Sequence, residues 1–168
     1  MNVSKELEAA LNEQIGIEFS ASHSYLSMAA YFERNAFDGF AQWMHLQSVE
    51  EHQHAMKFYQ YLNDRGGVAR LPAIEAPRWE YGSVREVFEA SLEQEHSVTE
   101  HIYGLYKLAQ NESDFATVSF LKWFVDEQVE EEKTVSDMID KLKMAEGNPD
   151  SLLFLDRYAM ERKSEELA

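Results

Sequence analysis

The sequence has 168 residues, 45% of them hydrophobic and 12% aromatic, and its 31 acidic and 15 basic residues give a formal charge of -16. A disordered acidic tail would lack aromatic residues, so we expect a folded chain with one domain spanning residues 1–168. The charge favours cations as partners and disfavours nucleic acid and anionic membranes, and the absence of cysteine excludes disulfides and thiolate metal sites.

The N-terminal residues contain neither the basic stretch nor the apolar stretch that together direct secretion. No segment approaches the roughly 18 consecutive apolar residues that a membrane-spanning helix needs. We therefore expect a cytoplasmic protein that does not bind a membrane.

Four long helices are expected, because residues 1–65 and 83–146 contain only three glycines and no proline. The first helix is predicted from Ser4, a candidate N-cap, to Asn35. The second is predicted over residues 38–65. A short turn joins the two, so they should run antiparallel.

Residues 66–82 are predicted to form a loop, because Gly67, Pro72 and Pro77 are incompatible with a continuous helix there. Fully extended, this loop would span roughly 55 Å. A helix of about 28 residues is only about 42 Å long, so the loop can cross the whole height of a bundle.

The third and fourth helices should form a second antiparallel hairpin. The third is predicted from Ser83, whose spacing to Glu86 fits a capping box, to Asn111. The fourth is predicted from Asp114, a candidate cap, to Glu146.

A short fifth helix is predicted over about residues 149–163, with Asn148 as its cap and Pro149 in its first turn. The expected fold is therefore all-α. It is a four-helix bundle over about residues 4–146, with a long crossover loop after the second helix and a short C-terminal helix.

Each long helix carries an apolar stripe at alternating spacings of three and four residues, the pattern that a bundle helix buries. Polar side chains interrupt each stripe at its centre, at one height of the bundle roughly 20 Å along each axis. The four stripes are Leu7, Leu11, Gln14, Glu18, Ala21, Tyr25, Met28 and Phe32; Phe40, Met44, Gln47, Glu51, His54, Phe58 and Tyr61; Val84, Phe88, Ser91, Glu95, Val98, Ile102 and Leu105; and Thr117, Leu121, Phe124, Gln128, Glu131, Val135, Met138 and Leu142.

The two predicted hairpins are related by an internal repeat of 77 positions. Three pairs of central residues share this separation: Glu18 with Glu95, Glu51 with Gln128, and His54 with Glu131. Within the second and fourth helices, the three-residue spacing puts both central residues on one helical face. Each half of the chain should therefore contribute an equivalent set of polar side chains to one layer.

Several carboxylates in one layer of an apolar core need compensation, because an unneutralised buried charge is very costly. The four buried stripes together form the seam of the bundle. A buried salt bridge would need Lys or Arg at the central positions of this seam, and none occurs there. Shared protons could stabilise one pair of acids, but they do not explain why four converge. Two divalent cations would neutralise the layer, and ligation by oxygen with one histidine suits iron or manganese better than structural zinc. The candidate ligands are Glu18, Glu51, His54, Glu95, Gln128 and Glu131.

With this motif the chain resembles the ferritins, most closely the non-haem ferritins of bacteria, over nearly its whole length. By resemblance, Glu18, Glu51 and His54 would hold the first ferroxidase iron, with Glu51 bridging to the second. Tyr25 lies two turns from Glu18 and matches a tyrosine near the iron pair of the family. We therefore expect it to be a catalytic residue that can donate an electron, with Trp123 as a candidate neighbour.

The same resemblance assigns the second iron to Glu95 and Glu131, with Gln128 beside it. Glu131 also belongs to a third iron site of the family. The remaining acids of that third site match Glu50, Glu127 and Glu130. The implied cofactor is iron, with two ferroxidase irons per subunit and a third site.

Three departures separate the chain from other branches of the family. Bacterioferritins have a second Glu-x-x-His and a methionine after the first Glu of the second helix, whereas this chain has Glu131 and His52, so haem is not expected. Miniature ferritins bind iron between subunits, whereas here all the ligands lie in one chain. Near Val118 and Leu121 the chain lacks the acidic pair of the threefold channel in animal ferritins.

The resemblance implies an iron-storage ferritin with ferroxidase activity. O2 would oxidise Fe2+ at the intrasubunit pair of irons, and Fe3+ would be stored as mineral in a hollow shell of 24 subunits. The alternative is a di-iron or di-manganese redox enzyme without storage, which should have an open pocket beside the metals. A third interpretation is a purely structural acid cluster, which predicts no stoichiometric uptake of metal.

Overall fold

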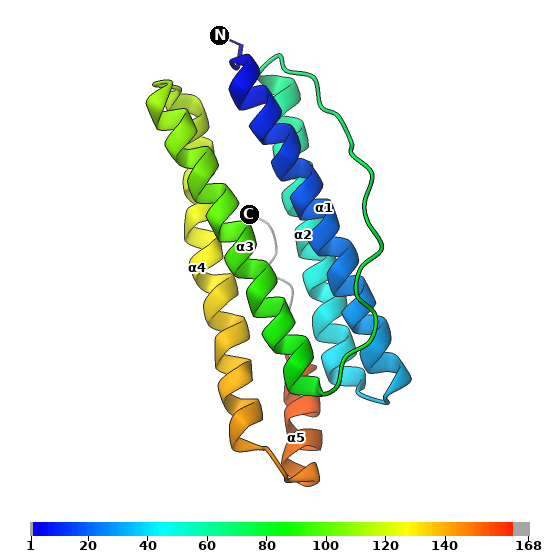
Figure 1. Ribbon diagram of the computed structural model, residues 1–168. Helices are drawn as coiled ribbons and strands as arrows, with labels where there is room; N and C mark the ends of the chain where they lie inside the picture. The colour runs from blue at the N-terminus through cyan, green and yellow to red at the C-terminus, as the bar shows by residue number, and fades with distance from the viewer. Residues whose placement is uncertain (1, 163–168) are drawn as a thin grey trace.

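The computed structural model describes residues 2–162. Four long helices lie side by side and a shorter fifth helix packs at one end of them (Figure 1). The helices are α1 (Lys5–Arg34), α2 (Asp38–Asp64), α3 (Val84–Asn111), α4 (Phe115–Met144) and α5 (Pro149–Ala159). The expected helical bundle with a short C-terminal helix is confirmed, and no strand occurs within the described residues.

The helices start where capping side chains were predicted. At α1, α3 and α4, the backbone amide three residues after the cap donates to the capping oxygen, at 3.0 Å for Ser4, 3.1 Å for Ser83 and 3.0 Å for Asp114. The capping box at Ser83 is only half formed, because the Glu86 carboxylate accepts from the amide of Gly82 at 2.5 Å.

Helix α5 is shorter than predicted. Asn148 caps it as expected, accepting from the amides of Asp150 at 3.1 Å and Ser151 at 3.2 Å. The helix ends at Ala159 and not near residue 163, which lies outside the described residues. Its last amides bond three residues back, including Arg162 to Ala159 at 3.3 Å, and such bonds tighten the end of a helix.

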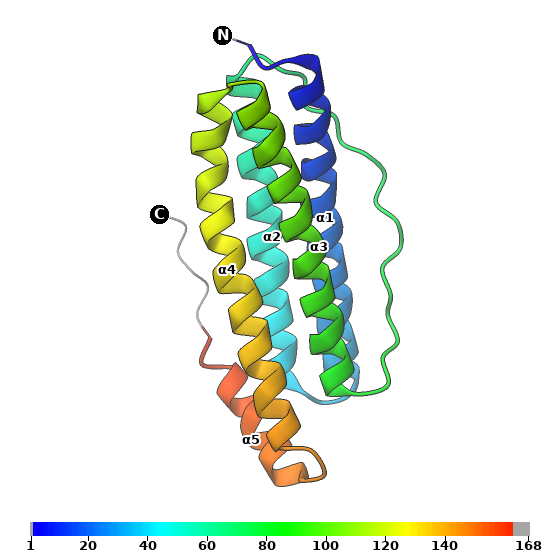
Figure 2. The same cartoon turned by 60° about the vertical axis from the view of Figure 1, so that its left-hand side comes forward.

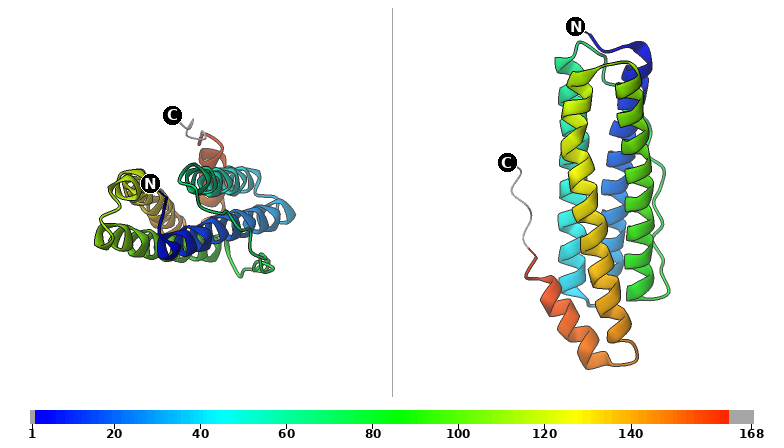
Figure 3. Two further views of the ribbon diagram at one scale, coloured as in Figure 1. Left: turned by 90° about the horizontal axis from the view of Figure 1, so that it is seen from above. Right: turned by 90° about the vertical axis from the view of Figure 1, so that its left-hand side faces the viewer.

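The chain runs as two antiparallel hairpins that the crossover loop connects. The loop follows the outside of α1 from one end of the bundle to the other (Figures 1 and 2). α1 and α3 approach closely, whereas no Cα atoms of α2 and α4 come within 8 Å of each other. Seen from above, the two hairpins pack as two pairs of helices, and α5 lies across the end of α2 and α4 (Figure 3).

The internal repeat extends to the hairpin turns. Ala36 and Ser113, which are 77 positions apart, adopt left-handed backbone angles with φ of 59° and 56°. Each turn also has an amide bonded five residues back, Phe37 to Phe32 at 3.0 Å and Asp114 to Ala109 at 2.9 Å. The two halves of the bundle therefore share their turn geometry as well as their seam.

The predicted seam forms the core. All of its positions are buried except Tyr61, which is half-buried while its neighbour Leu62 is fully covered. The apolar side chains separate into two clusters, one around Phe32 and Phe88 and the other around Phe58 and Phe124. The central polar residues of the seam lie between these clusters. Within the described residues, no helix is long and apolar enough to cross a membrane.

Candidate metal centre

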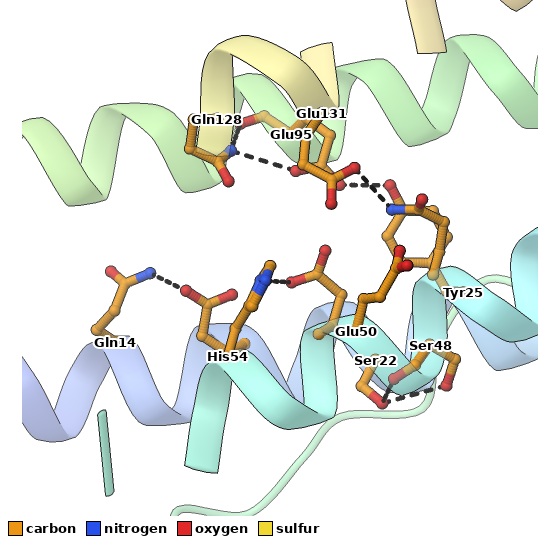
Figure 4. A network of polar contacts seen from close by, with 12 residues as sticks. Gln14, Ser22, Tyr25, Ser48, Glu50, His54, Glu95, Gln128 and Glu131 are labelled. Atoms are coloured by element: carbon orange, nitrogen blue, oxygen red, sulfur yellow. Dashed lines mark hydrogen bonds and ion pairs between the residues drawn. The ribbon is translucent and has the colours of Figure 1, made fainter. Parts of the chain in front are cut away.

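The structure buries all six predicted ligands near the middle of the four long helices. Figure 4 shows four of them, His54, Glu95, Gln128 and Glu131. Each of the four long helices supplies at least one of the six ligands from the middle of its buried stripe. Their exposed fractions are 0% for Glu18 and Glu95, 1% for Glu51, 2% for His54 and Gln128, and 5% for Glu131. Acids this deeply buried need neutralisation or protonation.

Three of the six form a compact group that could hold a metal ion. One potential ligand atom each from Glu18, Glu51 and His54 lies within 4.8 Å of the others. Nδ1 of His54 is 3.3 Å from a carboxylate oxygen of Glu51, because the three-residue spacing on α2 puts both side chains on the same face. Two oxygens and one imidazole nitrogen from two adjacent helices make a suitable donor set for iron.

The opposite half of the layer comes from α3 and α4. The amide nitrogen of Gln128 donates to the Glu95 carboxylate at 3.2 Å, to the Glu95 carbonyl oxygen at 3.3 Å and to Thr99 at 3.1 Å. These bonds occupy the amide nitrogen of Gln128 and hold the side chain of Glu95. Burial raises the pKa of Glu131, and the nearby charge of Glu95 raises it further.

Two seam glutamines orient the acids, a role that was not predicted for them. Gln14 donates to Glu18 at 2.8 Å, one turn along α1. Gln47 donates across the bundle to Glu131 at 2.9 Å. Both glutamines are buried, at 2% and 0% exposure. The sequence could have indicated this role, because both glutamines lie on an apolar stripe beside an acid and buried amides are normally hydrogen-bonded.

Tyr25 is buried directly beside the acids. Its hydroxyl donates a short hydrogen bond to Glu95 and lies 3.0 Å from Ser91 Oγ. Burial, followed by the negative charge of Glu95, raises the pKa of Tyr25 well above its usual value, so the phenol stays protonated. Tyr25 therefore contacts a candidate ligand, as expected of a residue near the metals.

Trp123 lies against the candidate imidazole ligand. Its ring centroid is 5.4 Å from that of His54, in an edge-to-face arrangement. The ammonium group of Lys57 lies 3.3 Å from the indole centroid, on a side chain that also approaches Glu127. Trp123 therefore contacts both the imidazole of His54 and the cation of Lys57.

Several oxygen atoms of the layer have no hydrogen-bond partner. Among the described residues, one carboxylate oxygen each of Glu18 and Glu51 and the amide oxygen of Gln47 are fully buried and accept no hydrogen bond from another group, although the carboxyl groups of Glu18 and Glu51 lie close enough to share a proton. Unpaired buried oxygens are destabilising, and such groups mark functional positions or sites where ions bind. A cation between the two halves of the layer would accept these lone pairs.

The four acids of the layer all have raised pKa values. Burial is the main cause for each. For Glu18 the charge of Glu51 adds to it, and for Glu51 the charge of Glu95 does. Glu95 and Glu131 reach a pKa of about 7, even though hydrogen bonds from Tyr25 and Gln47 respectively lower these values.

The acids assigned by resemblance to a third site lie at the outer edge of the layer. Glu50 is buried, Glu127 is half-buried and Glu130 is exposed. Together with Glu131 they line a cavity of about 20 Å³ between α2 and α4, which Arg162 also lines. No basic residue occupies the central seam positions, but Arg162 provides a cation at this edge.

The chain matches known proteins over most of its length. The family model described as Ferritin-like domain matches residues 8–145. A bacterial non-haem ferritin of Staphylococcus epidermidis is 51% identical over 83% of this chain and 84% of its own length. The corresponding protein of Staphylococcus saprophyticus is 43% identical over 98% of both chains. The crystal structure of an open-pore ferritin from Archaeoglobus fulgidus is 41% identical, with a TM-score of 0.95, over 96% of this chain and 100% of that one.

Proposed function

Because the chain belongs to the ferritin family, we propose that it is an iron-storage ferritin that oxidises Fe2+ with O2 at the buried polar layer. The observation that carries this proposal is the compact group of Glu18, Glu51 and His54, whose ligand atoms lie within 4.8 Å of one another inside an apolar core. A salt bridge within the seam does not account for this group, whereas bound cations do.

In the proposed site, two Fe2+ ions bind as substrates within one subunit. The first is held by Glu18, Glu51 and His54, and Glu51 bridges to the second, which Glu95 and Glu131 hold. Supporting this division, the unpaired oxygens of Glu18 and Glu51 belong to the α1–α2 half of the layer. Glu95 is held in position separately by Tyr25 and Gln128 in the α3–α4 half.

The chemistry follows from placing two irons beside each other. Each Fe2+ gives up one electron to become Fe3+, so a pair can reduce one O2 by two electrons, with two protons taken up to form H2O2. The acids of the layer have raised pKa values and would release protons when Fe2+ binds, close to where O2 consumes them. Tyr25, bonded to Glu95, is placed to supply a further electron and proton.

The outer acids would take a third iron on its way out of the inner pair. Glu50, Glu127, Glu130 and Glu131 line one cavity, and its volume of about 20 Å³ has room for one water-sized particle. Because Glu131 faces both the inner layer and this cavity, it is the natural ligand through which an ion passes between them.

The remaining proposals concern the assembly. We propose that residues 1–168 form one domain, that 24 copies form a shell, and that the protein works in the cytoplasm. A formal charge of -16 per chain would attract Fe2+ towards such a shell. Solved ferritins that share the fold of this chain support shell formation.

A redox enzyme acting on an external organic substrate is less well supported. Such an enzyme needs an open pocket beside the metals. A groove of about 760 Å³ runs along α1 beneath the crossover loop, but none of the six candidate ligands lines it. The cavity that does reach Glu131 is about 20 Å³, which admits ions and water but no larger substrate.

The test is an aerobic titration of the metal-free protein with Fe2+, following the ferric absorbance and the mass of the particle. Storage predicts that each subunit oxidises and retains far more than three irons in a large assembly. Uptake that stops at two or three irons, or a small oligomer, would contradict storage. Glu51→Ala should abolish fast oxidation, whereas His52→Ala, which changes the exposed neighbouring residue, should not.

A further inference from the structure

Arg162 reaches back from the end of α5 to the outer edge of the acidic layer. Its Nη2 atom lies 2.8 Å from Oε2 of Glu50, and the two side chains are only 14% and 7% exposed. Its guanidinium carbon lies 4.7 Å from the ring centroid of Trp43 on α2, within the range of a cation–π contact. The cation is therefore held by a carboxylate and an aromatic face and is largely shielded from water.

The surroundings of Arg162 are acidic but do not satisfy it completely. It lines the cavity of about 20 Å³ together with three acids of α4, Glu127, Glu130 and Glu131. Its other terminal nitrogen, Nη1, is buried and has no hydrogen-bond partner among the described residues. A buried donor without a partner is costly, so this position of the guanidinium is less stable than a fully bonded one.

We propose that Arg162 is an internal cation of the outer site, occupying it until a third metal ion displaces the guanidinium. This inference rests on the proposed function, because the outer site is the proposed third iron site. The guanidinium carries one positive charge at all relevant pH values, whereas the incoming ion carries two. Among the described residues, the guanidinium is hydrogen-bonded to Glu50 and to none of the inner ligands, although its charge also reaches Glu131. The outer site would therefore fill after the inner pair.

The alternative is that Arg162 is only a tether that fixes the end of α5 to α2. Both roles keep the Glu50 ion pair, but they differ once metal is added. A displaceable cation competes with the third ion, so removing it strengthens binding of that ion. A tether does not compete, so removing it leaves this affinity unchanged and loosens only the end of the chain.

The experiment is an anaerobic calorimetric titration of the metal-free assembled protein with Zn2+, which binds without redox chemistry. In the wild type we expect two tight ions and a weaker third per subunit. Arg162→Gln should bind the third ion about tenfold more tightly, an effect of the size expected for losing a nearby like charge. Arg162→Lys keeps the charge and should stay near the wild type. Arg157→Gln, an exposed arginine of α5, is the matched control.

Trp43 offers a second readout that a tether would not affect. When the third Zn2+ displaces the guanidinium from its ring, the tryptophan emission of the wild type should change at that equivalent. Trp43→Phe should lose this change and keep the emission of Trp79 and Trp123. Arg162→Gln should also lose this change in emission, because no guanidinium then lies against the ring of Trp43.

The outcomes separate this inference from the function on which it rests. If the wild type binds fewer than two Zn2+ per subunit, the proposed inner site is wrong. If two bind tightly but the third has the same affinity in Arg162→Gln and the wild type, Arg162 is only a tether. If Arg162→Gln does not assemble, the titration of the wild type is sufficient. Tryptophan emission that stays unchanged when the third Zn2+ binds would contradict displacement of the guanidinium.

Discussion

Buried carboxyls with raised pKa values make a specific prediction about the metal-free protein. Glu131 has a pKa of about 7 in the folded chain, against an ordinary value of 4.5. Between these values the folded state keeps a proton that the unfolded chain releases. Stability therefore falls as the pH rises from 4.5 through 7, and the loss is complete above pH 7. This dependence of stability on pH is opposite to that of a carboxylate in a salt bridge, which stabilises the folded state more as the pH rises.

The size of the effect follows from the two pKa values. Raising the pH from about 5.5 to about 8 should cost the metal-free protein about 2 kcal/mol for Glu131 alone. Glu95 should contribute a similar amount, because its pKa is also about 7. The side chain in Glu131→Gln cannot ionise. Over this pH range the stability of this variant should therefore fall by about 2 kcal/mol less than that of the wild type. Glu100→Gln, at an exposed position on α3, is the control and should keep the wild-type slope.

The assay is guanidinium denaturation of chelator-treated protein at fixed subunit concentration, with the free energy of unfolding compared at the two pH values. Saturating Zn2+ should remove the loss at high pH, because the ions neutralise the deprotonated acids. A metal-free protein whose stability is the same or greater at pH 8, with Glu131→Gln behaving like the wild type, would refute the account of buried protonated acids.

Three further substitutions test individual contacts. Tyr25→Phe removes the hydrogen bond to Glu95 and should weaken binding of the second Zn2+ about tenfold by calorimetry, and an unchanged affinity would show that Tyr25 does not position this ligand. Gly39→Ala would put a Cβ atom 1.6 Å from the carbonyl oxygen of Asp156, so it should destabilise the protein by about 3 kcal/mol and expose α5 to proteolysis. In Gly104→Ala the new Cβ meets nothing within 4 Å, so the helix should gain about 0.5–1 kcal/mol, and a loss of stability there would contradict the open environment.

The polar layer could be predicted from the sequence because each helix carries its signal locally. A stripe with alternating spacings of three and four determines which face is buried, and an acid on that stripe must then be internal. Tyr61 shows the limit of the pattern. Near the end of α2 its ring stacks on Phe120 at 3.9 Å and stays half-buried, and Leu62 takes the core position.

Contacts between distant segments could not be predicted in this way. Arg162 and Glu50 are 112 positions apart, and nothing in the pattern around either residue indicates that they meet. Gln47 was recognised as a seam residue, but its bond to Glu131 depends on how α2 and α4 are placed across the bundle. The end of α5 was also predicted too late, because nothing in the sequence pattern indicates the hydrogen bonds three residues back that follow Ala159.

The central claim is that two metal ions neutralise the buried acids. Its most direct test is anomalous diffraction at the iron edge from crystals soaked anaerobically in Fe2+. Two iron peaks per subunit should lie in the polar layer, one among Glu18, Glu51 and His54 and the other between Glu51, Glu95 and Glu131. Iron bound stoichiometrically elsewhere, with no peak in this layer, would contradict the account.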